Sequence, residues 1–285
     1  MDKIAVVSMQ RNESKYILEW LAYYLVQGVD RFIIYNHQSI DDTAEIYTQL
    51  SKHLDITLYT MTGHNVHYPM LEHALTNHKD ETDWLIFADM DEFYFPTEAN
   101  SIREVLSQYR DITASAIGVY WCAFGSSGLV QDPDLVLPSY VNRGELNIST
   151  NHHMKSIVRG RHSGWVRGTN PHVFTTQYGT VDLQGHTIPP YAGHNIDATP
   201  VHAPMRINHY QCKSWEYFKT VKQVRGSTAD RPPGAPGAEI PDSVFHEYDY
   251  NDVPDDAIWR RFGEPVLNKI EELKRLLHEP TSDNT

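Results

Sequence analysis

Cysteine is scarce in this chain, and its scarcity excludes several kinds of protein. Among 285 residues there are 2 cysteines, Cys122 and Cys212, which lie far apart in the sequence. Disulfide-stabilised secreted domains and thiolate zinc sites both require more cysteines at closer spacing. We therefore predict a chain that folds around an ordinary hydrophobic core in a reducing compartment, and we assign it to the cytoplasm.

Positive charge and long apolar runs are also lacking. The formal net charge is −13 at pH 7, whereas proteins that bind mainly nucleic acid or anionic membranes need a basic surface. No stretch approaches the roughly 20 apolar residues of a membrane-spanning helix, and the first residues do not resemble a signal peptide. We expect no nucleic-acid partner and no membrane span. Local basic clusters could still hold a phosphate, and peripheral membrane association stays open.

The first third of the sequence alternates between apolar runs and helical patterns. Runs rich in β-branched residues predict strands, and apolar residues spaced by three and four predict helices. In chain order the pattern predicts strand 3–9, helix 13–27, strand 31–35, a helix starting near residue 43, strand 55–60, helix 68–79 and strand 84–88. With right-handed crossovers, this order predicts an α/β fold whose Rossmann-like sheet is mainly parallel and flanked by helices.

The stretch DWLIFADMDEFYF, residues 83–95, is the centre of the functional prediction. Its apolar run predicts a strand buried on both faces, and the run ends in carboxylates. On an extended chain Asp89 and Asp91 would point to the same side and Met90 to the other. Two carboxylates at the carboxyl end of a buried strand predict a site for a hard divalent cation.

The triplet D-x-D is weak evidence by itself. A second copy, residues 132–134, contains proline and follows no apolar strand, so we interpret it as a turn. The alternative for Asp89 and Asp91 is that they only cap the next helix.

Three turns of the predicted sheet bring polar residues to one edge. They follow the first, second and fourth strands and carry Arg11 with Asn12, Asn36 with Asp41, and Asp89 with Asp91. Amides and carboxylates suit a base and ribose, a guanidinium suits a phosphate, and a metal suits a diphosphate. Neither common glycine-rich phosphate loop is present. The pattern therefore favours a nucleotide held by metal and side chains and used as a leaving group.

The rest of the chain is less regular. Residues 129–204 predict mixed short strands, such as 155–158 and 172–176, and long loops. Residues 213–224 predict an amphipathic helix, and 228–243 predict a lid or a disordered loop. We expect the last helix, about 255–279, to be interrupted at Gly263 and Pro265. The residues expected to pack it on the domain are Val266, Leu267, Ile270, Leu273 and Leu277.

These segments together resemble a known family. The series is QRNE, EWLAYYLVQGVDRFIIYN, SIDDT, DWLIFADMDEF, WCAFGSSG, KSIVR, PHVF, RINHYQCKSWEYF and RGSTAD, which run in order from about residue 4 to residue 230. The chain resembles glycosyltransferases of the GT-A fold. More narrowly, it resembles glycosyltransferase family 92 and its bacterial relatives in family 2, also called domain of unknown function 23. The chain departs from the family at Tyr35-Asn36, where an aspartate commonly precedes the asparagine.

The resemblance implies one GT-A domain over residues 1–285. Its nucleotide-sugar-binding half would be 1–96, its acceptor-side half 97–230, and its closing loop and helix 231–285. Asp89 and Asp91 would be the metal-binding motif and His209 a further metal ligand, and this mixture of ligands favours Mn²⁺ over Mg²⁺. The remaining implied donor-site residues are the turn Arg11, Asn12 and Glu13 near the nucleotide, and Lys213 and Arg225 facing the diphosphate.

The expected reaction is metal-dependent transfer of a sugar from a nucleoside-diphosphate sugar, with UDP-sugars favoured, to a glycan or another hydroxyl acceptor. The resemblance implies inversion, which requires a base for the acceptor proton. Asp182 and His172 are the candidates because they lie in the loop-rich half, although each is equally compatible with ordinary loop structure. Two alternatives remain: a nucleotidyltransferase that makes activated sugars, and a catalytically silent carbohydrate-binding protein.

Overall fold

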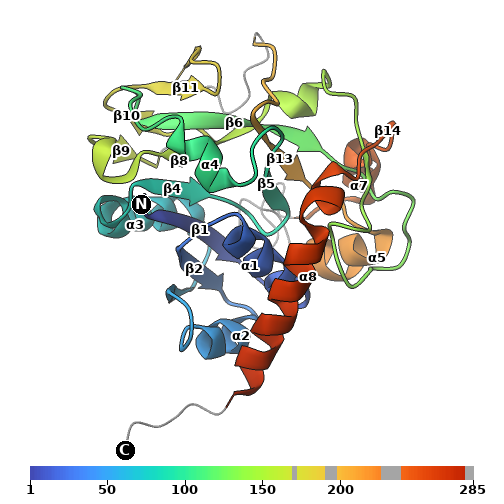
Figure 1. Cartoon of the computed structure of the whole chain (residues 1–285). Helices are drawn as coiled ribbons and strands as arrows, with labels where there is room; N and C mark the ends of the chain where they lie inside the picture. Colours follow the sequence, from blue (N-terminus) through green and yellow to red (C-terminus); the bar gives the residue numbers. More distant parts are fainter. Residues whose placement is uncertain (169–171, 190–197, 226–238, 280–285) are drawn as a thin grey trace, which may run out of the picture.

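The computed structural model describes residues 1–168, 172–189, 198–225 and 239–279. A 10-stranded sheet crosses the molecule in the order β12-β11-β6-β8-β4-β1-β2-β3, and β13 joins β5 to β6 beside it (Figure 1). Its strands are β1 (Ile4–Gln10), β2 (Arg31–His37), β3 (Ile56–Met61), β4 (Trp84–Phe87), β5 (Glu92–Pro96), β6 (Ala116–Ala123), β8 (Met154–Val158), β11 (Thr180–Asp182), β12 (Thr187–Ile188) and β13 (Met205–His209).

Strand direction divides the sheet into two parts. The pairs β3–β2, β2–β1 and β1–β4 are parallel, whereas β8 runs antiparallel between β4 and β6. Beyond it, β11 and β13 are parallel to β6, and β5 is antiparallel to β13. The predicted α/β fold, with a mainly parallel sheet and a mixed second half, is confirmed.

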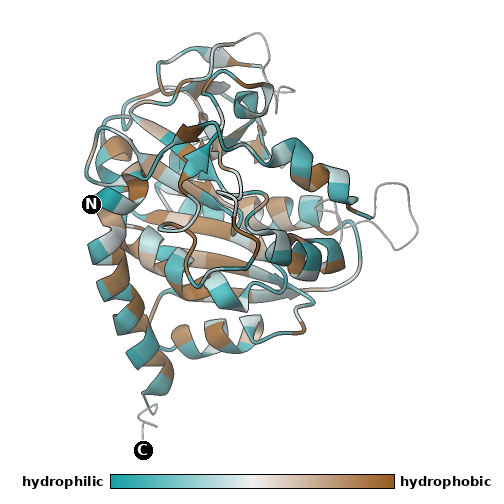
Figure 2. Cartoon of the chain, turned by 90° about the vertical axis from the view of Figure 1, so that its right-hand side faces the viewer, coloured by the Kyte–Doolittle hydropathy of each residue, from teal (hydrophilic) through white to brown (hydrophobic). Residues whose placement is uncertain are grey.

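Helices cover both faces of the sheet. They are α1 (Ile17–Val26) after the short 3-10 turn Ser14–Tyr16, α2 (Thr43–Leu50), α3 (His67–His78), α4 (Ile102–Ser107), α7 (Asp242–Tyr248) and α8 (Ala257–His278). Alternate residues of β1 point to opposite faces: Ile4 and Val6 join the core beneath α1 and α8, and Ala5 and Val7 join the core beneath α3. Burial on both faces explains why this strand is a continuous apolar run, and Figure 2 shows the interior strands largely in brown.

The last helix differs from its prediction. It continues from Ala257 to His278 through Pro265 and packs on α1 and α2 (Figure 1). The predicted interruption is therefore wrong, and so is the packing role of Leu267, which is 41% exposed. Val266, Ile270 and Leu273 are buried, as predicted.

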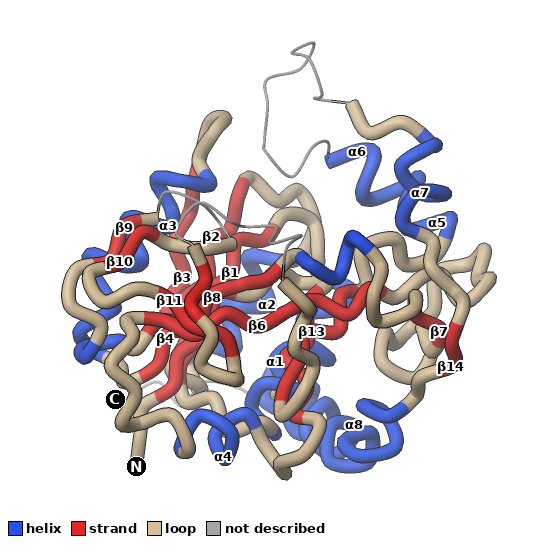
Figure 3. The backbone as a smooth tube through the Cα atoms, turned by 90° about the horizontal axis from the view of Figure 1, so that it is seen from above, coloured by secondary structure: helices blue, strands red, loops and turns tan. Residues whose placement is uncertain are grey.

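Two other segments are irregular where regular elements were expected. Residues 213–224 form α5 (Trp215–Tyr217), a π-helical turn (Phe218–Lys222) and α6 (Gln223–Arg225), which gather with α7 at one side of the molecule (Figure 3). Of the predicted strand 172–176, only Thr175–Thr176 is a strand, β10, which pairs with β9 (Val166–Arg167).

A further two-stranded pair joins β7 (Asn142–Arg143) with β14 (Val253–Pro254). The predicted lid or loop at 228–243 lies largely outside the described residues.

Candidate functional site

The candidate site lies at the carboxyl edge of the parallel strands, where the strand order changes direction. β2 and β3 lie on one side of β1, and β4 lies on the other. The two strand ends are held side by side, since the Ala88 N–H donates to the Val7 carbonyl at 3.0 Å. The turns after β1, β2 and β4 therefore share one edge, as predicted, at the position where open α/β sheets bind ligands.

The acidic pair does not lie on an extended strand. β4 ends at Phe87, and residues 89–92 form a tight turn in which the Glu92 N–H donates to the Asp89 carbonyl at 3.1 Å. The expected alternation of side chains along a strand is therefore wrong here. Met90 is buried, while the side chains of Asp89 and Asp91 are 45% and 14% exposed and have different partners.

Asp91 faces a histidine from a distant strand. The antiparallel register of β13 with β5 places His209 opposite Glu92, and Tyr210 N–H donates to the Asp91 carbonyl at 2.8 Å. The Asp91 carboxylate lies 3.6 Å from His209 Nε2 and 3.8 Å from Lys222 Nζ. Burial works to raise the pKa of Asp91, but these two neighbours hold it well below its ordinary value.

Asp89 is paired instead with Lys155 of β8. Lys155 Nζ donates to Asp89 Oδ2 at 2.8 Å and lies 3.6 Å from Glu92 Oε2. Burial works to raise the pKa of Asp89, but the ammonium of Lys155 keeps it below its usual value. Burial raises the pKa of the fully enclosed Glu92, which Lys155 opposes.

Glu92 connects the acidic turn to β6. Its Oε2 accepts the Asp89 N–H at 2.9 Å, and its Oε1 accepts the indole N–H of Trp121 at 2.9 Å. The turn is thus tied to the neighbouring strands through one buried carboxylate. Its conformation is fixed by one contact within the turn and one contact to β6.

A group of rings surrounds Trp121 next to these charges. His209 and His153 lie with ring centroids 4.1 Å and 4.9 Å from that of Trp121, and His172 lies 5.2 Å away. His172 Nδ1 is 2.9 Å from the Met154 carbonyl. Burial, assisted by Lys155, lowers the pKa of His172 to about 3. His172, one of the two predicted bases, therefore lies in the site but is a weak base.

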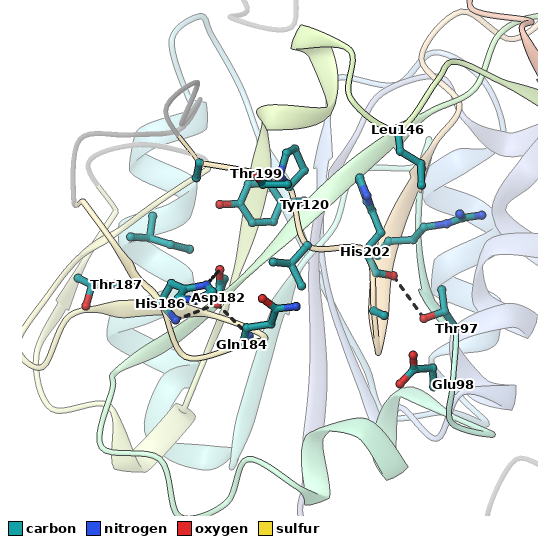
Figure 4. A pocket seen from close by; sticks show the side chains of 16 residues that line it. Thr97, Glu98, Tyr120, Leu146, Asp182, Gln184, His186, Thr187, Thr199 and His202 are labelled. Atoms are coloured by element: carbon teal, nitrogen blue, oxygen red, sulfur yellow. Dashed lines mark hydrogen bonds and ion pairs between the residues drawn. The ribbon is translucent and has the colours of Figure 1, made fainter.

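Asp182, the other predicted base, lies elsewhere. Its carboxylate accepts the N–H groups of Gln184 and His186 at 2.8 and 2.9 Å and lies 3.0 Å from His186 Nδ1. β11 places it opposite Gly118, about 16 Å along β6 from Ala123 at the site edge. It lines a separate cavity of about 790 Å³ (Figure 4). The structure does not bring Asp182 to the acidic turn.

The turns after β1 and β2 are bound to each other. Asn12, at a φ of 55° that asparagine tolerates, donates its N–H to Ser39 Oγ at 3.0 Å and accepts the Ile40 N–H at 2.9 Å. Asn36, which is buried, accepts the Ser39 N–H at 3.4 Å. Arg11 is half-buried next to Asn12. These three predicted nucleotide residues are therefore close together on ordered turns.

Asp41 and Glu13 act mainly within the fold. Asp41 accepts the N–H groups of Ser14 and Thr43 at 3.0 and 3.1 Å. Partial burial works to raise the pKa of Asp41, but these hydrogen bonds lower it. Glu13 is buried and accepts the Tyr217 hydroxyl at 3.0 Å. Both carboxylates therefore join the turn after β1 to its surroundings.

Lys213 is enclosed in the described structure. It is 0% exposed, its Nζ lies 3.8 Å from Glu13 Oε2, and it is 4.3 and 4.1 Å from the ring centroids of Tyr16 and Tyr217. In this conformation Lys213 does not face an open donor site. Arg225 is the last residue of α6, and its side chain lies outside the described part of the chain.

The donor atoms at Asp91 fit a divalent cation in part. A carboxylate oxygen and an imidazole nitrogen 3.6 Å apart can bind one ion, and such ions commonly take their other ligands from water and phosphate. Across residues 1–168, 172–189, 198–225 and 239–279, no group of three or more His, Cys, Asp or Glu side chains is arranged to hold a metal. Asp91 and His209 are thus two possible ligands for an ion, whereas Asp89 is paired with Lys155.

Several residues of the site were missed by the sequence prediction. They are Glu92, Trp121, His153, Lys155 and Lys222. The clearest signal is Lys155, a charged residue within the otherwise apolar strand MKSIV, whose five residues are all buried. A lysine in such a strand needs an anionic partner, and the acidic turn supplies it.

Among the described helices, none combines the length and apolar character required to span a bilayer.

Sequence comparison connects the chain to a known family. The pattern of glycosyltransferase family 92 matches residues 4–122. A glycosyltransferase family 92 protein of Ricinus communis is 27% identical over 238 residues, covering 79% of this chain and 38% of that protein. A glycosyltransferase family 92 protein of Oryza sativa subsp. japonica is 26% identical over 223 residues, covering 76% of this chain and 34% of that protein. The chain spans well under half the length of these relatives.

Among solved structures, the similarity is more distant. The structure of S. aureus TarS 1–349 has a TM-score of 0.38 and 17% sequence identity, over 55% of this chain and 47% of that chain. The complex of TarS 1–349 with UDP-GlcNAc has a TM-score of 0.39 and 15% identity, over 55% and 45% of the two chains. The family pattern and the two plant relatives thus show a similarity of this chain to glycosyltransferase family 92.

Proposed function

We propose that the chain is a glycosyltransferase that moves a sugar from a nucleoside-diphosphate sugar to a hydroxyl acceptor. The observation that carries this proposal is the meeting of Asp91 with His209 at the carboxyl edge of β1 and β4, next to the interlocked turns after β1 and β2. A nucleotide and a charged leaving group require neighbouring sites of these two kinds. The similarity to glycosyltransferase family 92 supports the same reaction.

The turns after β1 and β2 would bind the nucleoside. Asn12 and Asn36 offer amide groups on a loop already ordered by hydrogen bonds through Ser39, so that binding costs little conformational entropy. The half-buried Arg11 offers a guanidinium to a phosphate at the same edge. UDP-sugars are the favoured donors, and a panel of nucleotides tests this choice.

Asp91 and His209 would hold a divalent cation, Mn²⁺ or Mg²⁺. When bound, such an ion stabilises negative charge on a departing diphosphate. Asp91 supplies a carboxylate that stays ionised at neutral pH, because His209 and Lys222 hold its pKa low. His209 supplies an imidazole, which tilts the preference toward Mn²⁺. Lys222, 3.8 Å from Asp91 and nearly buried, would add positive charge on the leaving-group side.

An inverting transfer needs a base for the acceptor proton. Of the two predicted bases, His172 is near Lys155 and Trp121 in the site, while Asp182 is enclosed by its own hairpin. A histidine whose pKa is about 3 is a poor match to a general base at neutral pH. We therefore favour His172 as a contact for the acceptor and propose an inverting outcome on the family resemblance alone.

The direct test is transfer with defined donors. Purified protein is incubated with UDP-, GDP-, CMP- and dTDP-sugars, with Mn²⁺, Mg²⁺ or EDTA and a panel of glycan acceptors. We expect free nucleoside diphosphate and a new glycoside from one donor class, with the signal lost in EDTA. Release of pyrophosphate from a nucleoside triphosphate and a sugar phosphate would instead support a nucleotidyltransferase. Glycan binding without turnover of any donor would contradict the proposal.

A further inference from the structure

Lys155 is an unusual residue for its position. It lies in β8 between β4 and β6, and its side chain is 5% exposed. Burying an ammonium group is unfavourable unless anionic partners compensate, and an apolar residue of similar size is often as stable there. Its presence in an apolar strand is therefore not explained by packing.

Lys155 contacts two carboxylates of the acidic turn. Its Nζ is 2.8 Å from Asp89 Oδ2 and 3.6 Å from Glu92 Oε2. Glu92 in turn accepts the N–H of Asp89 at 2.9 Å. Asp89 is thus held at its side chain by Lys155 and at its backbone by Glu92.

Asp91 differs from Asp89 in the kind of contact it makes. Its two ion-pair distances, 3.6 Å to His209 and 3.8 Å to Lys222, are longer than a hydrogen bond. The carboxylate therefore has capacity for a ligand between it and His209. The two aspartates of the D-x-D triplet are not equivalent.

We propose that Lys155 is a positioning residue that takes the place of a cation at Asp89, so that only Asp91 and His209 serve the divalent cation. Asp89 then orients the turn and does not coordinate the ion. This inference rests on the proposed glycosyl transfer, because it assigns roles within that site. It predicts that the two aspartates fail differently when each is neutralised.

The first experiment measures Mn²⁺ binding by electron paramagnetic resonance of the free ion, with the full chain and no substrate. We expect Asp91→Asn to weaken Mn²⁺ binding by roughly tenfold or more, as for loss of a unit charge near the ion. Asp89→Asn should change it by no more than about threefold, since its charge is already balanced by Lys155. Equal losses in the two variants would overturn the proposal, as would an unchanged protein that does not bind Mn²⁺.

The second experiment removes the built-in cation. Lys155→Met frees Asp89 and withdraws one positive charge, so Mn²⁺ binding should tighten by roughly tenfold while kcat falls. Lys155→Arg keeps the charge and should bind Mn²⁺ as the unchanged protein does. A merely structural lysine would lower the unfolding temperature of Lys155→Met without changing its affinity for Mn²⁺, which would overturn the proposal.

A double variant keeps the test valid if Lys155→Met does not fold. Lys155→Met with Asp89→Asn removes both partners and leaves no unpaired charge between them, and it should bind Mn²⁺ within about threefold of the unchanged protein. Tenfold weaker binding would contradict the proposal. The proposed glycosyl transfer and the proposed role of Lys155 can fail independently. If the unchanged protein turns over no nucleotide sugar, glycosyl transfer is refuted. The Mn²⁺ titrations still decide the roles of Asp89 and Lys155.

Discussion

The acidic turn 89–92 and the hairpin at 182–188 each hold an aspartate beside a histidine, yet only the aspartate of the acidic turn is arranged to accept a ligand. Asp182 and His186 are four residues apart and 3.0 Å from each other, and Asp182 also accepts N–H groups from its own hairpin. Asp91 and His209 come from different strands and lie 3.6 Å apart. A carboxylate closed by its own loop has little capacity left for a ligand. One whose partners come from separate strands can keep that capacity.

The sharpest way to break this comparison is to neutralise each aspartate. Asp91→Asn should lower kcat/KM for glycosyl transfer by roughly 100-fold or more, because it removes charge at the reacting centre. Asp182→Asn should keep it within about threefold. The kcat/KM of both variants is measured with the donor class that the transfer assay identifies, with circular dichroism as a control for folding. Equal losses would mean that the hairpin takes part in the reaction.

The histidines allow a second comparison. His209→Asn should weaken Mn²⁺ binding by about 10-fold to 100-fold and shift the preference toward Mg²⁺, because an oxygen donor replaces the imidazole. His186→Asn should change neither property, since its side chain is 69% exposed and remote from the acidic turn. Calorimetric titration with both metals measures the effect. An unchanged preference in His209→Asn would remove His209 from the ligand set.

Stability should also separate the two regions. Trp121→Phe leaves Glu92 Oε1 without the indole N–H that now lies at 2.9 Å, and we expect the free energy of unfolding to fall by about 1 to 3 kcal/mol. His186→Ala removes an exposed partner and should change it by less than about 0.5 kcal/mol. Urea denaturation of the two variants gives both values. A stable Trp121→Phe protein would show that Glu92 does not depend on this bond.

The last comparison concerns the dependence of stability on pH. The pKa of His172 is lowered to about 3 by burial, below the ordinary value near 6.5, so the unfolded chain binds more protons between these pH values. Its contribution to the free energy of unfolding is complete above pH 6.5 and is lost as pH falls toward 3. His172→Gln should flatten this slope in urea titrations from pH 7 to pH 5. An unaltered slope would show that His172 is not buried as a neutral ring.

Much of the fold could be predicted because local patterns decide it. The apolar runs of β1, β2 and β4 are buried on both faces, and this is visible in their composition. The path of α8 through Pro265 could not be predicted, because packing on α1 compensates for the hydrogen bond that proline cannot make. Local preference alone favours an interruption there.

The site could be predicted only in part, for a related reason. Asp89 and Asp91 are visible as acids after an apolar run, but their different partners depend on strand pairing across the whole chain. Lys155 reaches Asp89 because β8 lies next to β4, and His209 reaches Asp91 because β13 pairs with β5. The charge of Lys155 within an apolar strand indicates that an anionic partner exists, but neither strand pairing is visible in the local sequence, so the triplet appeared as two equivalent ligands.

The pairing of β5 with β13 also has a consequence for how the protein matures. Glu92 and His209 lie opposite each other although they are far apart in the sequence, so the contact has a high sequence separation. Contacts of this kind form late, because a long loop must close first. On the ribosome the amino-terminal strands would fold before β13 has emerged. The contact between Asp91 and His209 would therefore form only after β13 has been synthesised.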